Sequence, residues 1–181
     1  WNMSGSYNIE NALAAIAAAN SIGITPASSL ESLASYKGVK RRLEKLVTIS
    51  NITIYDDFAH HPTSIKKTIE GIHENHSHKR IIIAIEIRSN TMLSGAHNSA
   101  LLESVKDADF VFFYQSNKDK RSLESQGLLD KNNMQITYDI EVLAAKLISI
   151  LRDDDALIFM SNGDFCGAKE LFTKQLENLH V

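Results

Sequence analysis

Residues 55–63, Tyr-Asp-Asp-Phe-Ala-His-His-Pro-Thr, bring two carboxylates and two imidazoles together in one short bend. An acid at such a bend can accept hydrogen bonds from ribose hydroxyls in a nucleotide site, or it can cap the following helix. The sequence leaves both interpretations open for Asp56 and Asp57. His60 and His61 are candidate ligands, proton carriers or ordinary loop residues. Because no HxxxH or CxxC spacing occurs, we predict no zinc site.

Two further polar clusters follow apolar runs. The first, residues 86–92 (EIRSNTM), places Arg88 where a guanidinium can take a carboxylate or phosphate in a bidentate manner, or pair with Glu86. The second, residues 161–167 (SNGDFCG), holds Asp164 in a glycine-containing turn, and we interpret Cys166 as a packing residue. A lone turn of this kind is weak evidence for a ligand site.

Polar side chains also occur before residue 46. Residues 40–42 (Lys-Arg-Arg) form a basic cluster that is either a solvated loop or a phosphate clamp between two parts of the chain. Asn8 and Asn11 lie three residues apart and therefore on one face of an alanine-rich helix. Their amides can read an adenine edge, or Asn8 can simply cap the helix.

The elements that must position these residues alternate between strands and helices. Apolar runs predict strands at 81–86, 109–114 and 156–161 after a strand or hairpin around Ser50-Asn51. Helical spacing predicts helices from Pro62, at 97–106, 139–152 and 165–179. This order predicts an α/β domain over residues 46–181, with a mostly parallel, Rossmann-like sheet covered on both faces. Its polar clusters would meet at the carboxyl ends of the strands. The polar region 120–136 is expected to be an irregular surface excursion.

Residues 1–45 are expected to be all-helical and separate from the α/β domain. They predict a tightly packed helix at 7–22 and a second from Pro26 to about Tyr36, with too little apolar material for a core of their own. The chain begins with Trp1 rather than Met, so we expect a piece of a longer protein.

The overall composition excludes several classes of protein. The 181 residues are 44% hydrophobic and 23% charged with a net charge of −3, which argues against disorder and general nucleic-acid binding. No apolar run reaches the roughly 18 residues of a membrane span. The single cysteine excludes an internal disulfide and fits a reducing cytoplasm.

Three segments in order, GSYNIENALAAIAAA, GVKRRLE and YDDFAHHPTSI, resemble the Mur ligases, which form amide bonds in peptidoglycan precursors using ATP. RSNTM and MSNGDF further resemble the branch that recycles muropeptides. The resemblance implies that residues 1–45 end the central ATP-binding domain and that 46–181 form the C-terminal domain. No GxxxxGK[ST] phosphate loop occurs, so the fragment is expected to be inactive alone.

The resemblance also implies ligands and roles. ATP and Mg²⁺ would be the cofactors, with the metal ligands mostly outside this chain. The substrates would be UDP-N-acetylmuramate and the murein tripeptide L-Ala-γ-D-Glu-meso-diaminopimelate, joined through an acyl phosphate. The partners would be the N-terminal and central domains of the same chain, with no nucleic acid or membrane. The alternatives are the ligase that adds L-alanine to the same sugar and a non-catalytic nucleotide- or peptide-binding module.

Position by position, the family resemblance assigns Asn8 and Asn11 to adenine, Arg42 to phosphate and Asp57 to ribose. The candidate catalytic residues are Arg42, His60 and His61, although neither histidine receives a step. The candidate substrate-binding residues are Arg88, Ser89, Asn90 and Asp164. The chain departs from the recycling branch at Tyr7, where histidine is usual, at Ile87, where proline is usual, and at Asp164 and Cys166, where glycine is usual.

Overall fold

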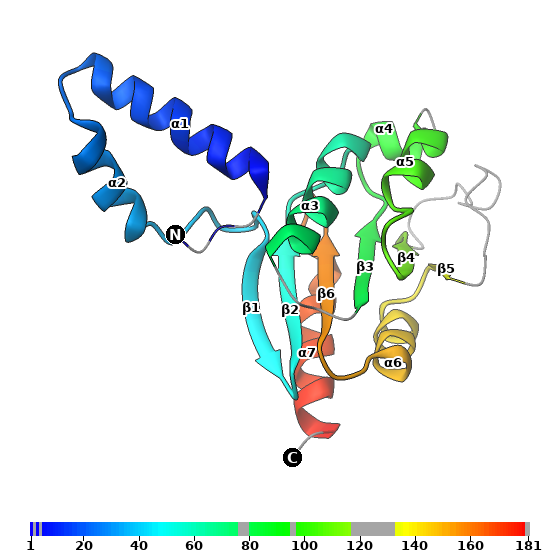
Figure 1. The fold of residues 1–181 in the computed structure, drawn as a ribbon. Helices are drawn as coiled ribbons and strands as arrows, with labels where there is room; N and C mark the ends of the chain where they lie inside the picture. The colour runs from blue at the N-terminus through cyan, green and yellow to red at the C-terminus, as the bar shows by residue number, and fades with distance from the viewer. Residues whose placement is uncertain (2, 4, 76–79, 95–96, 117–132, 180–181) are drawn as a thin grey trace.

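The computed structural model describes residues 1, 3, 5–75, 80–94, 97–116 and 133–179. Its centre is a six-stranded sheet in the order β1-β2-β6-β3-β4-β5 (Figure 1). Strands β1 (Glu44–Ile49) and β2 (Ile52–Asp57) form an antiparallel hairpin, and every other neighbouring pair is parallel. Of the strand or hairpin predicted around Ser50-Asn51, the hairpin is confirmed, and both residues have positive φ, as a two-residue type I′ loop requires.

The remaining strands are β3 (Arg80–Glu86), β4 (Phe110–Tyr114), β5 (Met134–Thr137) and β6 (Asp155–Met160). The first, second and fourth of these confirm the predicted strands. Strand β5 corrects the prediction of an irregular region at 120–136, because residues 134–137 pair with β4. Residues 120–132 of that predicted excursion lie outside the described part of the chain.

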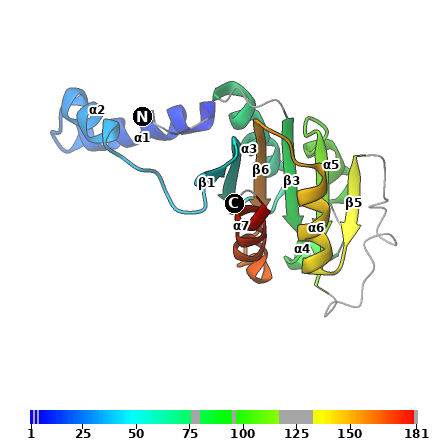
Figure 2. The ribbon, with the colours of Figure 1, turned by 90° about the horizontal axis from the view of Figure 1, so that it is seen from below.

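Helices cover both faces of the sheet, as the strand–helix alternation predicted (Figure 2). Helices α3 (Pro62–Asn75), α4 (Asn90–Leu93) and α5 (Asn98–Ser104) lie on one face, and α6 (Ile140–Ile150) and α7 (Ala168–Leu179) on the other. Alternate residues of β3 serve the two cores: Ile81, Ile83 and Ile85 contribute to the first, and Ile82 and Ala84 to the second. The period of two in a pleated strand produces this division.

Helices α1 (Ser6–Ser21) and α2 (Pro26–Ala34) form a hairpin that projects away from the sheet (Figures 1 and 2). The expected tight packing of α1 is wrong, because Ile9 and Leu13 are each 61% exposed. Only Asn8 is buried on this helix. The hairpin is joined to α3 at its base, where the backbone N–H of Ser6 donates to Glu74 and Gly5 lies against Gly71. Gly5 has a φ of 91°, which favours glycine at this close approach.

Candidate functional site

The three predicted polar clusters meet at one edge of the sheet. They follow β2, β6 and β3, which are neighbours in the sheet and run parallel, so their carboxyl ends lie side by side. A short 3₁₀ turn, η2 (Phe165–Gly167), joins the loop after β6 to α7. The convergence predicted from the sequence is therefore confirmed.

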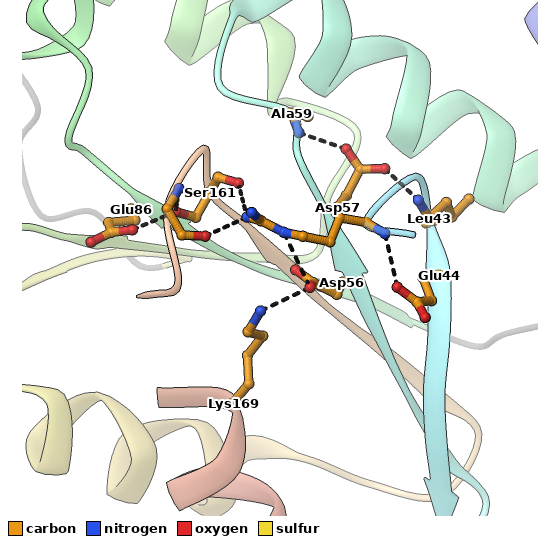
Figure 3. Close-up of polar contacts among 10 residues, drawn as sticks. Leu43, Glu44, Asp56, Asp57, Ala59, Glu86, Ser161 and Lys169 are labelled. Atoms are coloured by element: carbon orange, nitrogen blue, oxygen red, sulfur yellow. Dashed lines mark hydrogen bonds and ion pairs between the residues drawn. The ribbon is translucent and has the colours of Figure 1, made fainter. Parts of the chain in front are cut away.

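Asp57, the predicted ribose-binding acid, ends β2 and is only 4% exposed. One carboxylate oxygen accepts from the backbone N–H of Ala59 at 2.7 Å, and the other from that of Leu43 at 2.6 Å (Figure 3). Burial raises the pKa of Asp57, while these bonds and the charge of Arg42 act in the opposite direction. Asp57 does not cap α3. Its carboxylate instead joins the end of β2 to the segment that leads into β1.

The neighbouring Asp56 belongs to a buried ionic cluster. Lys169 of α7 donates to its Oδ2 at 2.8 Å, and Nε of Arg41 lies 3.5 Å from the same oxygen (Figure 3). The side chains of Asp56 and Lys169 are 6% and 13% exposed. A carboxylate this well buried requires such partners. The helix-capping interpretation of Asp56 is therefore wrong.

Glu86 and Ser161 fix the loop after β6. The hydroxyl of Ser161 donates to Oε2 of Glu86 and accepts from the backbone N–H of Gly163 at 2.7 Å. The carbonyl oxygens of Ser161 and Gly163 both accept from Nη2 of Arg41, the first at 2.6 Å. Arg41 thus joins this loop to the segment before β1.

Arg88 pairs across this loop with Asp164 rather than with Glu86. The distance between Arg88 Nη1 and Asp164 Oδ1 is 3.7 Å, and the two side chains are 54% and 82% exposed. The guanidinium lies directly over the Cα of Gly163, where a Cβ would clash with it. Asp164 also accepts from the backbone N–H of Cys166, and this bond lowers the pKa of its carboxyl group. Asp164 therefore caps the turn before α7 and pairs with Arg88.

The other predicted substrate-binding residues and histidines lie nearby. Ser89 caps α4 by accepting from the backbone N–H of Met92 at 3.3 Å, and Asn90 is the exposed first residue of that helix. His60 Nδ1 lies 2.9 Å from the carbonyl oxygen of Phe58, while His61 Nδ1 accepts from the backbone N–H of Thr63 at 3.4 Å.

A small cavity of about 10 Å³ borders these two histidines. His97, at the start of α5, also lines it, and its ring packs edge-on against that of His61 with 5.4 Å between centroids. This space is about the size needed for one water molecule.

A larger pocket lies between the helical hairpin and the segment before β1. It has a volume of about 640 Å³ and contains Asn8, Asn11 and Arg42 together. The structure thus brings three of the four predicted ATP contacts to one pocket, whereas the fourth, Asp57, is not among its lining residues. The rest of the lining is largely apolar or aromatic: Trp1, Met3, Tyr7, Ala12, Ala15, Ser32, Leu33, Tyr36 and Val39. The alternative that Asn8 caps α1 is wrong, because Gly5 occupies that position and no side chain caps the helix.

Two departures from the expected family pattern lie in well-defined backbone settings. Ile87 stands where proline is usual, and its backbone N–H donates to the carbonyl oxygen of Tyr114 at 2.7 Å, a bond that proline cannot make. Cys166 stands where glycine is usual and has a φ of 52°, in the left-handed region that favours glycine. It is exposed and its thiol contacts Glu86, so the packing interpretation of Cys166 is wrong.

Sequence reasoning missed three parts of this site: Arg41, the Asp56–Lys169 pair and the Glu86–Ser161 contact. Lys169 lies 113 residues after Asp56, and Ser161 lies 75 after Glu86, so no local pattern could join them. Adjacent arginines gave no signal for which one turns inward. Among the described residues no three His, Cys, Asp or Glu side chains gather as metal ligands, and no described helix is long and apolar enough to cross a membrane.

The fold and site agree with a known class of enzyme. Residues 41–163 match the family model of the Mur ligase glutamate ligase domain, and the chain belongs to the Mur ligase family. Mur ligases are ATP-dependent carbon–nitrogen ligases.

Within that family, the chain is similar to ligases that act on a murein tripeptide. It is 34% identical over 168 residues to the UDP-N-acetylmuramate–L-alanyl-γ-D-glutamyl-meso-2,6-diaminoheptandioate ligase of Escherichia coli K12, covering 92% of this chain and 37% of that protein. It superposes on the murein peptide ligase of Psychrobacter arcticus 273-4 with a TM-score of 0.75 and 33% identity, covering 98% of this chain and 38% of the other.

A separate domain ascribed to such a ligase in Haemophilus ducreyi 35000HP is also similar. It has a TM-score of 0.60 and 32% identity, covering 75% of this chain and 99% of the other. UDP-N-acetylmuramate–L-alanine ligases are also among the matched relatives. The chain spans under two fifths of the length of the tripeptide ligases to which it is similar.

Proposed function

We propose that this chain is part of an ATP-dependent ligase that joins UDP-N-acetylmuramate to L-Ala-γ-D-Glu-meso-diaminopimelate during peptidoglycan recycling in the cytoplasm. The observation that carries the proposal is 33–34% identity to the tripeptide ligases over 92% or more of this chain. The pocket supplies side chains suited to binding the nucleotide, and the polar edge of the sheet supplies side chains suited to binding the incoming peptide.

The pocket that holds Asn8, Asn11 and Arg42 suits the nucleotide. Its aromatic and apolar walls can pack against a base, and the two amides offer both donors and acceptors for the edge of adenine. The guanidinium of Arg42 is suited to a phosphate oxygen. Asp57 is proposed to hold the ribose through a carboxylate lone pair that is not used by the backbone N–H groups of Leu43 and Ala59 or by the side chain of Thr68, since an ionised carboxylate has about four acceptor sites. A neighbour of similar fold, a Mur ligase from Thermotoga maritima, was crystallised with ADP.

The proposed reaction activates a carboxylate. ATP transfers its γ-phosphoryl group to the lactyl carboxylate of UDP-N-acetylmuramate, and the peptide amine then displaces phosphate to form the amide. The protein's contribution is positioning and charge neutralisation. Arg42 would neutralise charge on the transferred phosphoryl group. His60 and His61, at the N-terminus of α3, are proposed to face the reacting end of ATP, and neither is assigned a proton transfer.

The incoming peptide is proposed to meet the edge formed by Arg88, Ser89, Asn90 and Asp164. Arg88 can exchange its exposed partner for a peptide carboxylate, because an ion pair this open to solvent is weak. Asp164 adds a negative charge beside it, suited to an ammonium group. If Arg88 leaves Asp164 for a peptide carboxylate, the hydrogen bond from the backbone N–H of Cys166 to Asp164 would remain.

Mg²⁺ would offset the phosphate charge. Because no group of three potential ligands occurs among the described residues, we propose that most of its ligands belong to other parts of the ligase. Residues 1–45 are proposed to be the end of the central domain. The exposed apolar residues of the α1–α2 hairpin, among them Ile9, Leu13 and Leu30, support this division because another domain surface would cover them.

Phosphate release by the intact protein tests the proposal. It should release phosphate from ATP with UDP-N-acetylmuramate, Mg²⁺ and the tripeptide, and much less when L-alanine replaces the tripeptide. Release with L-alanine alone would favour the alanine-adding ligase, to whose relatives this chain is also similar. No release with either amine would favour a binding module.

A further inference from the structure

Arg41 is anchored far more firmly than its neighbour Arg42. Its guanidinium donates to two carbonyl oxygens in the loop after β6, those of Ser161 and Gly163, and lies 3.5 Å from Asp56. Its own backbone also takes part, because its carbonyl accepts from Phe58 at 2.8 Å and its N–H donates to Glu44 at 2.8 Å. One residue thus joins the segment before β1 to the ends of β2 and β6.

The backbone of Arg41 shows how constrained this position is. Its φ is 58°, in the left-handed region that is unfavourable for a residue with a Cβ. Such a conformation persists only where surrounding contacts hold it. The contacts with Asp56, Ser161 and Gly163 are suited to do so, and Lys169 in turn neutralises Asp56 from α7.

The anchored residue is directly bonded to the proposed phosphate-binding one. Arg42 is exposed and lines the large pocket, while its backbone N–H donates to Val39 at 3.2 Å. Both guanidinium groups lie over the ring of Phe58, with 5.0 Å from Cζ of Arg41 and 5.5 Å from Cζ of Arg42 to the ring centroid. The place of Arg42 at the pocket is therefore set by a turn whose preceding residue is fixed to the sheet.

The anchor also reaches the proposed peptide side. Gly163, whose carbonyl accepts from Arg41, lies under the guanidinium of Arg88. Ser161 is held by Glu86, two residues before Arg88. Contacts of Arg41 therefore connect the nucleotide pocket with the edge that carries Arg88 and Asp164.

We propose that Arg41 is a positioning residue for the ligase reaction. It fixes Arg42 at the transferred phosphoryl group by anchoring the segment before β1 to the ends of β2 and β6. This inference rests on the proposed function of Arg42 as the phosphate-contacting residue. It assigns Arg41 no contact with ATP or substrate.

A double-mutant cycle on kcat in the intact protein tests the inference. Arg41→Ala is expected to lower kcat by roughly 10- to 100-fold, the loss typical of misplacing a catalytic group by about 1 Å, with little change in KM for ATP. Arg42→Ala is expected to lower kcat by on the order of 100-fold or more. The double variant should be no slower than Arg42→Ala alone, because the loss of kcat on removing Arg41 is expected to arise from the displacement of Arg42. Lys45→Ala, an exposed basic residue on β1, is the matched control and should retain wild-type kcat.

Effects of Arg41→Ala and Arg42→Ala that multiply in the double variant would overturn the inference, as would an unchanged kcat in Arg41→Ala. If Arg41→Ala does not fold, Arg41→Lys replaces it in the cycle. It keeps a charge beside Asp56 but cannot reproduce the fork that reaches both carbonyl groups. The cycle uses whichever amine the wild-type protein accepts. A preference for L-alanine would therefore contradict the proposed function and leave the test of Arg41 intact.

Discussion

Lys169→Met should destabilise the protein more than the loss of an ordinary surface lysine. Methionine keeps the unbranched apolar stem, so the change isolates the loss of the ammonium group. That group lies 2.8 Å from Oδ2 of Asp56, whose side chain is 6% exposed. Without it, the nearest cation is Nε of Arg41 at 3.5 Å.

The expected loss is about 2–3 kcal/mol of unfolding free energy. Breaking a buried ion pair by removing one partner typically costs roughly 3–5 kcal/mol, because the remaining charge is left uncompensated. Arg41 still offsets part of the charge of Asp56, so the expected loss is at or below the lower limit of that range. For a chain of this size the loss corresponds to a decrease in melting temperature of roughly 5–10 °C.

Urea unfolding followed by far-ultraviolet circular dichroism measures this change. Lys66→Met is the matched control, since Lys66 pairs with Glu70 at 3.8 Å on the surface of α3 and should lose less than about 0.5 kcal/mol. Adding Asp56→Asn to Lys169→Met should recover part of the loss, because it removes the uncompensated charge. A Lys169→Met protein as stable as the control would refute the assignment of Asp56 as a buried, ion-paired carboxylate.

Three further predictions concern the proposed nucleotide site. Arg42→Ala should lower kcat of the intact protein severely while its melting temperature stays unchanged, and near-normal turnover would contradict a phosphate role. Asn11→Ala should raise KM for ATP roughly three- to tenfold, the equivalent of one lost neutral hydrogen bond of about 0.5–1.5 kcal/mol, and an unchanged KM would exclude an adenine contact. Burial raises the pKa of Asp57, so the folded state binds more protons there than the unfolded state, and its stability contribution should fall as pH rises from the ordinary value of 3.8. Urea unfolding across acidic pH measures how steeply the free energy of unfolding changes with pH. The fall with rising pH should be smaller in Asp57→Asn than in the wild type, and an identical dependence in both proteins would contradict the prediction.

Local patterns were sufficient for most of the fold. Continuous apolar runs predicted β3, β4 and β6, and Pro62 marked the first residue of α3. Strand β5 was not predicted because Met134–Thr137 is only four residues long and follows a polar region without periodicity. The exposed apolar residues of α1 were misread for a related reason. A helix rich in alanine predicts close packing, but the pattern does not say whether the partner surface belongs to this part of the fold.

The site was predictable only where its members share a local pattern. The ends of parallel strands had to converge, so the three loops could be placed together in advance. The partners of individual side chains could not be predicted, because Asp56 contacts Lys169, and Glu86 contacts Ser161, across many residues of sequence. The same limit applied to the two adjacent arginines, whose different environments depend on a left-handed backbone at Arg41.

The most direct test of the proposed tripeptide ligase is a competition between amines. The intact protein is given UDP-N-acetylmuramate, ATP and Mg²⁺ with equal concentrations of L-Ala-γ-D-Glu-meso-diaminopimelate and L-alanine, and the products are identified by mass spectrometry. We expect UDP-N-acetylmuramate carrying the tripeptide to dominate, with one ADP formed per amide. A product that carries only L-alanine, or none with either amine, would contradict the proposed function.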